Sequence, residues 1–179
     1  MKQLYLSLVL LVVTSCIPLR IAPTIKEDKV MVARKFKKSL PNTNAFIFED
    51  PKDADEFYNY INTKYELGHQ NVEGNVPVII DNKEFFLSFY ETEIPTKTLN
   101  LVPILVDASL DSKGNDPMFE DAHVSRIGNW YLALTVSDTA MNDCLSPSYK
   151  DRDSIVKYLR DLRKEYLNTQ NYLEALFKK

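Results

Sequence analysis

The 179-residue sequence contains little glycine, cysteine and histidine, and each scarcity removes a class of function. The four glycines, Gly68, Gly74, Gly114 and Gly128, stand far apart, so the chain holds neither a phosphate-binding loop nor a dinucleotide-binding fingerprint. The two histidines and two cysteines do not stand at the spacing of zinc ligands. We therefore expect no metal, no cofactor and no nucleotide chemistry.

The charge balance removes a further class of partner. The formal net charge is -3, and the cations are concentrated between residues 17 and 38, where seven Lys or Arg stand against two acidic residues. Beyond residue 38 the chain is acidic. Because phosphate binding needs a cationic face, we expect no nucleic-acid partner. The basic stretch could instead contact anionic lipid head groups, at about 1 kcal/mol for each Lys or Arg near the surface.

The first fifteen residues have the pattern of a signal peptide. Lys2 precedes a nearly continuous apolar run from Leu4 to Val13. A membrane-spanning helix needs about 20 apolar residues, and this run has roughly half of that length. We expect residues 1–15 to direct export and then to be removed.

The apolar run ends in Val13-Thr14-Ser15-Cys16, which resembles the lipobox of bacterial lipoproteins position by position. The resemblance implies that the Cys16 thiol receives a diacylglycerol, that cleavage falls between Ser15 and Cys16, and that the new amine is acylated. Each buried methylene contributes about 0.8 kcal/mol, so two or three acyl chains give a stable membrane anchor. The alternative is a secretory signal whose cysteine lies near the cleavage site by chance.

The whole chain from Cys16 onward is similar in composition to small uncharacterised lipoproteins of Bacteroidota, which are rich in Asn, Lys, Tyr and Phe. In that group, acidic residues directly after the cysteine are associated with surface display, whereas here the first acidic residue is Glu27. Position 17 is Ile rather than the aspartate that can retain lipoproteins at the inner membrane. The resemblance therefore implies a cell-envelope location at the outer membrane, facing the periplasm.

The sequence after the signal peptide predicts a tether over residues 16–28 and a single α+β domain over residues 29–179. We expect an antiparallel β-meander of about four to five strands packed by two amphipathic helices. Residues 30–36 fit a strand or a short helix. The predicted strands are 45–49, 76–80, 84–90, 97–107 and 130–136, with turns at 81–83 and 95–96.

Each predicted helix has a candidate N-terminal cap. Asp50 and Pro51 suit the start of a helix that extends to Gly68, with Phe57 and Ile61 on its apolar face. A second helix follows Pro147, where residues 148 and 151 have the spacing of a capping box. Its apolar face contains Ile155, Tyr158, Leu159, Leu162 and Tyr166.

Lipidation of Cys16 would leave Cys144 without a disulfide partner in its own chain. An unpaired cysteine in an oxidising envelope is most often a buried, small apolar residue. The alternatives are an intermolecular disulfide and a reactive thiol.

The polar segment between residues 110 and 128 is the predicted interaction loop, because loops on a rigid sheet often carry function. The candidate residues are Asp116, Met118, Phe119, Glu120, Asp121, His123 and Arg126. Met118 and Phe119 are either an exposed contact pair or side chains that hold the loop on the sheet. The acidic residues around His123 are either a solvated loop or a metal or acid/base cluster.

The sequence carries no recognisable catalytic constellation, and we assign no catalytic residues. The first hypothesis is a lipid-anchored envelope lipoprotein with a non-catalytic domain that binds an envelope protein or has a structural role. The second is a lipoprotein that binds a small molecule or glycan, or a hydrolase that uses His123 in the 110–128 loop. The third is an immunity-type lipoprotein that neutralises a toxin, for which the acidic charge is the only support.

Overall fold

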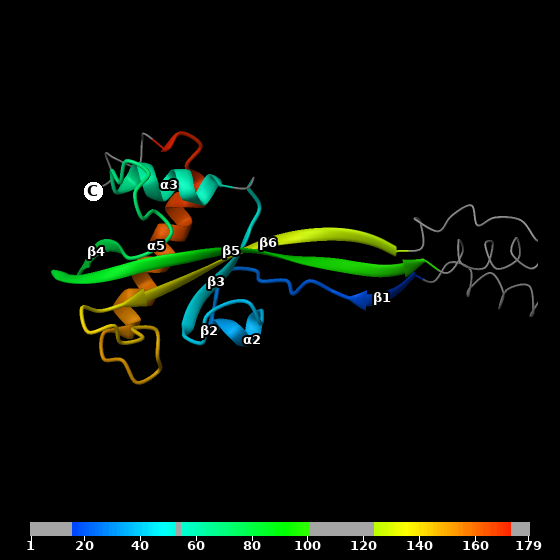
Figure 1. Cartoon of the computed structure of the whole chain (residues 1–179), viewed down its shortest axis with the longest axis horizontal. Helices are drawn as coiled ribbons and strands as arrows, with labels where there is room; N and C mark the ends of the chain where they lie inside the picture. Colours follow the sequence, from blue (N-terminus) through cyan, green and yellow to red (C-terminus); the bar gives the residue numbers. More distant parts are fainter. Residues whose placement is uncertain (1–15, 53–54, 101–123, 173–179) are drawn as a thin grey trace, which may run out of the picture. The chain divides into compact units, whose positions relative to one another are not determined.

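The computed structural model describes residues 16–52, 55–100 and 124–172. Figure 1 shows the helices and strands of these ranges in chain order: β1 (Cys16–Arg20), β2 (Lys29–Val32), α2 (Ala33–Phe36), β3 (Asn44–Asp50), α3 (Glu56–Lys64), β4 (Val76–Ile80), β5 (Lys83–Asn100), β6 (Val124–Ser137) and α5 (Arg152–Asn168).

The chain divides into two compact units. The first unit is formed by Met1–Pro23 with Glu93–Asn129, and the second by Thr24–Thr92 with Trp130–Lys179. The long strands β5 and β6 contribute residues to both units. The two units are described separately below.

The strands form an antiparallel sheet with the order β1-β5-β6-β3-β2, and β4 pairs with β5. The pairs β1–β5, β2–β3, β3–β6 and β4–β5 are all antiparallel. The consecutive strands β4, β5 and β6 are neighbours, as in a meander, and β3 joins the free side of β6. The α+β class predicted from the sequence is confirmed.

The predicted hairpin is present as β4 and β5, joined by a two-residue turn. Asp81 and Asn82 have φ values of 48° and 60°, as the tight hairpin turn with two left-handed residues requires. The turn predicted at Pro95 is wrong, because β5 continues through it to Asn100. Pro95 lies between the stretch of β5 that pairs with β4 and the stretch that pairs with β1, where its missing N–H removes no bond of those two ladders.

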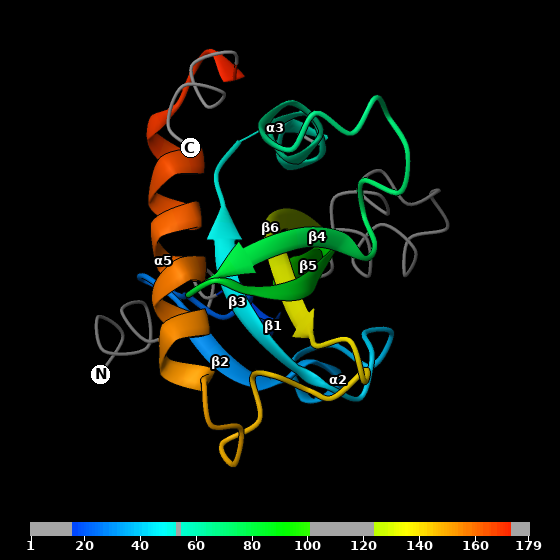
Figure 2. The same ribbon diagram turned by 90° about the vertical axis from the view of Figure 1, so that its left-hand side faces the viewer.

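In the second unit, α3 and α5 cover one face of the sheet. Figure 2 shows α3 near the C-terminal half of α5, where Lys64 and Glu165 join the two helices with an Nζ–Oε1 distance of 2.7 Å. The apolar residues on these helices and the inward residues of β3 to β6 form one buried cluster. At its centre the Phe57 ring meets four rings edge-on or tilted, with centroid distances from 4.9 to 6.3 Å, namely those of Phe48, Tyr60, Phe89 and Tyr166.

The opposite face of the same strands is also buried where α2 lies. Ala45 and Ile47 of β3 alternate with Phe46 and Phe48, and all four are fully buried. The Phe36 ring of α2 packs edge-on against the Tyr131 ring, with centroids 5.1 Å apart. The undecided residues 30–36 thus contain both a strand and a short helix, and α2 covers part of the second face.

Both predicted N-terminal caps are wrong. Asp50 belongs to β3, and its buried carboxylate accepts hydrogen bonds from the Tyr166 hydroxyl and the Lys52 N–H. The helix α3 begins at Glu56 instead. The helix α5 begins at Arg152, so Ser148 is not its N-cap as the capping box predicted. Asp151 occupies the N-cap position instead, but its side chain makes no capping bond and its carboxylate pairs with Lys83 Nζ at 2.7 Å.

The apolar face predicted for α5 is confirmed. Ile155, Leu159, Leu162 and Tyr166 are buried, and Tyr158 is half-buried.

Cys144 is also fully buried in the core of the second unit, in agreement with its interpretation as a small apolar residue. Burial raises the pKa of its thiol.

In the described part of the first unit, β1 runs antiparallel to the end of β5, with Cys16 opposite Asn100. Cys16–Arg20 therefore form a strand where the sequence indicated a tether. The Ala22 N–H donates to Thr96 Oγ1 at 3.0 Å. At Gly128 an added Cβ would lie 1.9 Å from Glu93 Oε1, so any larger residue there would require the Glu93 side chain to move.

Candidate functional site

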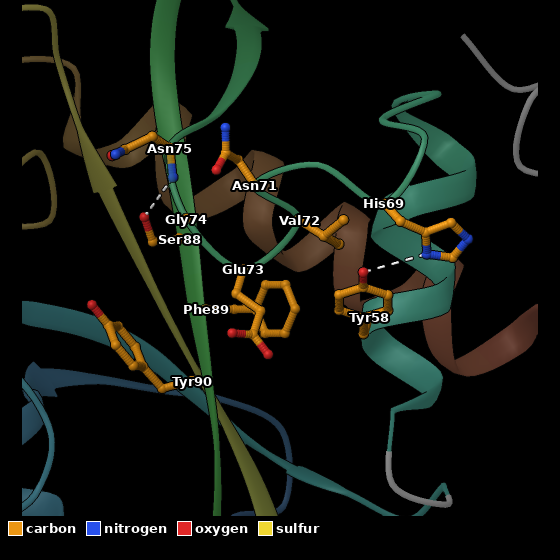
Figure 3. A pocket seen from close by; sticks show the side chains of 10 residues that line it. All are labelled: Tyr58, His69, Asn71, Val72, Glu73, Gly74, Asn75, Ser88, Phe89 and Tyr90. Atoms are coloured by element: carbon orange, nitrogen blue, oxygen red, sulfur yellow. Dashed lines mark hydrogen bonds between the residues drawn. The ribbon is translucent and has the colours of Figure 1, made fainter.

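One hollow of the second unit lies between α3, the loop 66–75 and β5, and has a volume of about 850 Å³. Figure 3 shows Tyr58, Glu73 and Phe89 on one side of β5 and Tyr90 on the other. Strand alternation gives the same result, since Phe89 points into the core and is buried whereas Tyr90 is 39% exposed. The hollow therefore follows the edge of β5 and is accessible from both of its faces.

The loop 66–75 has an unusual concentration of left-handed backbone. Besides Gly68, four residues have positive φ: Glu66 (55°), His69 (62°), Asn71 (51°) and Asn75 (57°). Such conformations cost L-residues energy and are frequent at ligand sites, where the surrounding structure holds them. Three of the four, all but Glu66, line the hollow.

Short-range contacts hold the loop in this conformation. The His69 ring stacks on the Tyr58 ring with centroids 5.9 Å apart, and its Nδ1 lies 3.3 Å from the Tyr58 hydroxyl. Its Nε2 lies 3.4 Å from Asn62 Nδ2, and the His69 backbone N–H donates to Asn62 Oδ1 at 2.7 Å. If the Asn62 amide donates to Nε2, the proton of the neutral imidazole lies on Nδ1 and is donated to Tyr58.

The other end of the loop is fixed to β5. The Phe89 N–H donates to the Glu73 carbonyl at 2.9 Å, and the Asn75 N–H donates to Ser88 Oγ at 3.0 Å. The loop thus accepts a backbone hydrogen bond from the edge of β5, just beyond the stretch of β5 that pairs with β4. The Glu73 side chain is exposed and lies over this edge (Figure 3).

A smaller hollow of about 370 Å³ adjoins the first and shares Glu73, Phe89 and Tyr90 with it. Its far side contains Lys37, whose Nζ donates to Thr92 Oγ1 at 2.6 Å. We call the two hollows together the β5-edge groove. It is an open, mostly polar channel within the second unit.

Glu91 gives the smaller hollow a perturbed carboxyl group. Burial raises the pKa of Glu91, and the neighbouring carboxylates of Asp50, Asp55 and Glu73 raise it further, while the Asp55 backbone N–H opposes this by donating to it. Glu91 Oε1 is buried and has no hydrogen-bond partner within the structure. The group therefore binds its proton more tightly than an exposed glutamate.

A third hollow beside Lys52 is structural in character. Lys52 Nζ donates to the carbonyls of Tyr166 and Thr169 at 2.7 and 2.6 Å and lies 4.4 Å from the Tyr166 ring centroid. The amine thus stabilises the C-terminal end of α5. Burial lowers the pKa of Lys52, but the amine is occupied by these acceptors.

Within residues 16–52, 55–100 and 124–172, no three His, Cys, Asp or Glu side chains are grouped as metal ligands would be. Over the same ranges, none of the helices combines the length and apolar character needed to cross a bilayer.

Most of the site residues predicted from the sequence lie outside the described residues. These are the signal peptide 1–15 and, in the interaction loop, Asp116, Met118, Phe119, Glu120, Asp121 and His123. The backbone of Arg126 belongs to β6, and that of Cys16 begins β1. The structure therefore leaves the predicted interaction loop and the lipid attachment as predictions.

The residues of the β5-edge groove were not selected from the sequence. A signal was present in Gly68-His69-Gln70-Asn71 and Gly74-Asn75, since Gly, Asn and His are the residues that tolerate positive φ. The sequence could not show that this loop folds against β5. Comparison with known proteins finds no matching family model, no similar curated sequence and no similar solved structure.

Proposed function

We propose that this chain is a lipid-anchored protein of the cell envelope, attached through Cys16, whose folded domain binds a partner molecule without catalysing a reaction. The observation that carries the anchor is the apolar run that ends in Val13-Thr14-Ser15-Cys16. Its resemblance to a lipobox supports acylation of Cys16. The proposed location is the outer membrane, facing the periplasm.

A binding role is supported by the chemistry of the described side chains. The His69 ring nitrogens lie near the neutral groups of Tyr58 and Asn62, whereas a catalytic imidazole is usually oriented by a carboxylate and directed at a nucleophile. The Cys144 thiol is buried, and burial raises its pKa, which is the reverse of an activated nucleophile. The groove offers aromatic rings, amides and a carboxylate for recognition instead.

Two partner classes remain proposals. An envelope protein that contacts the 110–128 loop is the first, and it rests on the composition of that loop alone. A polar small molecule or glycan is the second, and it is favoured by the β5-edge groove.

The anchor is tested by metabolic labelling with a palmitate analogue in cells that express the full chain. Cys16→Ser is expected to abolish the acyl label and to release the protein from the membrane fraction, because the thiol is the proposed attachment point. Cys144→Ala is the matched control and should keep both the label and the membrane association. A Cys16→Ser protein that still carries the label, or a wild-type protein without it, would contradict the proposal.

A further inference from the structure

We infer that the β5-edge groove is a binding site for a neutral oligosaccharide. This inference names the ligand class of the binding role proposed above and does not depend on the lipid anchor. All of the residues involved belong to the second unit.

Aromatic side chains give the groove apolar surface in an otherwise polar setting. Tyr90 is 39% exposed on one face of β5, and Tyr58 is half-buried at the edge of the groove on the other face. A tyrosine presents a flat apolar ring together with a hydroxyl. The C–H faces of a pyranose have the same mixed character, so a sugar ring can stack on the tyrosine while its hydroxyls remain hydrogen-bonded.

The polar groups of the larger hollow fit hydroxyl groups better than ions. Asn71 and Asn75 offer amides that both donate and accept, and Glu73 offers a carboxylate that accepts two hydrogen bonds. None of the described residues that line this hollow is a Lys or Arg, which disfavours a phosphate or carboxylate ligand there. An ammonium ligand would use the carboxylate but would leave the amide donors unpaired.

The shape of the groove fits a chain of sugar units rather than an isolated small molecule. The two hollows, of about 850 and 370 Å³, lie next to each other and share Glu73, Phe89 and Tyr90 in their linings. Sites for small molecules are usually enclosed and mostly apolar, whereas this groove is open and polar.

An extended peptide is the competing chain-like ligand, and the strand edge disfavours it. A peptide that adds to a sheet needs free backbone N–H and C=O groups along the edge strand. Here the Phe89 N–H already donates to the Glu73 carbonyl, and Leu87 is paired with Val76. At these two positions the backbone of β5 is already paired, so a peptide could not add to the edge of β5 along the larger hollow.

The conformation of the loop indicates that the backbone carrying these side chains is held in place before a ligand arrives. Asn71 and Asn75 keep left-handed backbone, and His69 is held by Tyr58 and Asn62. A rigid arrangement of this kind reduces the entropy that binding would otherwise cost.

The test is isothermal titration calorimetry of the detergent-solubilised full chain with a panel of neutral hexasaccharides. The panel contains the β-1,4-linked hexamers of glucose, mannose, xylose and N-acetylglucosamine. We expect saturable binding of at least one hexasaccharide. Tyr90→Ala should weaken it about 10-fold or more through loss of the stacking surface. Asn71→Gly should weaken it as well, because it removes the amide while glycine keeps the left-handed backbone.

The matched control is Asn82→Gly, which makes the same change at another left-handed residue, in the β4–β5 turn away from the groove. It should bind like the wild type, and thermal unfolding of each variant confirms that it is folded. Absence of saturable binding by every hexasaccharide, or binding that both groove variants leave unchanged, overturns the inference. Spermidine is titrated as a polyamine probe. If it binds the groove more tightly than the hexasaccharides, the ligand class is an amine and the inference is wrong. If no hexasaccharide binds but Cys16 carries the acyl label, the inference about the ligand is wrong and the proposal of a lipid anchor is unaffected.

Discussion

The helix-covered face of the second unit and the β5-edge groove both use tyrosine, with opposite results. Tyr60 and Tyr166 on the covered face are fully buried, whereas Tyr90 in the groove is 39% exposed. The Tyr166 hydroxyl donates to both Asp50 oxygens, at 3.1 and 3.0 Å, and the Tyr60 hydroxyl donates to the Leu162 carbonyl at 3.5 Å. Burial raises the pKa of both phenols.

The difference shows how the same residue type serves packing in one place and recognition in another. On the covered face each hydroxyl is committed to an internal acceptor, so the tyrosines behave as large apolar side chains with a satisfied polar end. In the groove the Tyr58 hydroxyl lies 3.3 Å from Nδ1 of the exposed His69 imidazole. Exposure, rather than tyrosine content, distinguishes the candidate site.

The largest expected effect is on the free energy of unfolding, which should depend much more on the helix-covered face than on the groove. Phe57→Ala removes the ring at the centre of the covered face, and we expect a loss of about 3 to 5 kcal/mol in the free energy of unfolding. Urea denaturation followed by circular dichroism measures it. Tyr90→Ala in the groove should cost less than about 1 kcal/mol, because its ring is already exposed. Equal losses in the two variants would contradict the distinction.

A smaller effect is expected for the ion pair that joins the two covering helices. The side chains of Lys64 and Glu165 are 11% and 17% exposed, so Lys64→Met leaves a largely buried carboxylate without its partner. We expect a loss of about 1 to 3 kcal/mol in the free energy of unfolding. The control is Lys83→Met, whose exposed pair with Asp151 should contribute about 0 to 1 kcal/mol. A larger loss in the control would show that helix packing does not depend on the buried pair.

The smallest expected effect is the contribution of Glu91, in the groove, to the pH dependence of the free energy of unfolding. Burial, together with Asp50, Asp55 and Glu73, raises the pKa of Glu91 above its ordinary value of 4.5, so the folded chain binds the proton more tightly than the unfolded chain. Stability then falls as the pH rises through the interval above 4.5, and the cost persists at neutral pH. Glu91→Gln should therefore raise the free energy of unfolding at pH 7 by more than it does at pH 4. Thermal unfolding at both pH values measures this. A variant that is stabilised equally at both values would contradict the assignment.

Local residue patterns predicted the elements well where burial decides them. The β-branched and aromatic residues in 76–80 and 84–90 correspond to the β4–β5 hairpin, and the apolar spacing in 155–166 corresponds to α5. The predicted caps at Asp50 and Ser148 are wrong because both helices begin several residues later. Asp50 and Asp151 instead bond to residues far away in the sequence, Tyr166 and Lys83. A capping rule considers only local backbone and cannot anticipate such competition.

The sequence by itself determined the α+β class, the hairpin, the amphipathic α5 and the lipobox-like motif on which the anchor proposal rests. Each of these depends on residues close together in the chain, where side-chain periodicity and turn chemistry act directly. Only the tertiary structure brought loop 66–75 against β5 and separated buried tyrosines from exposed ones. The groove joins α3, this loop and β5, and the free energy that holds them together comes from packing between segments that no local pattern connects.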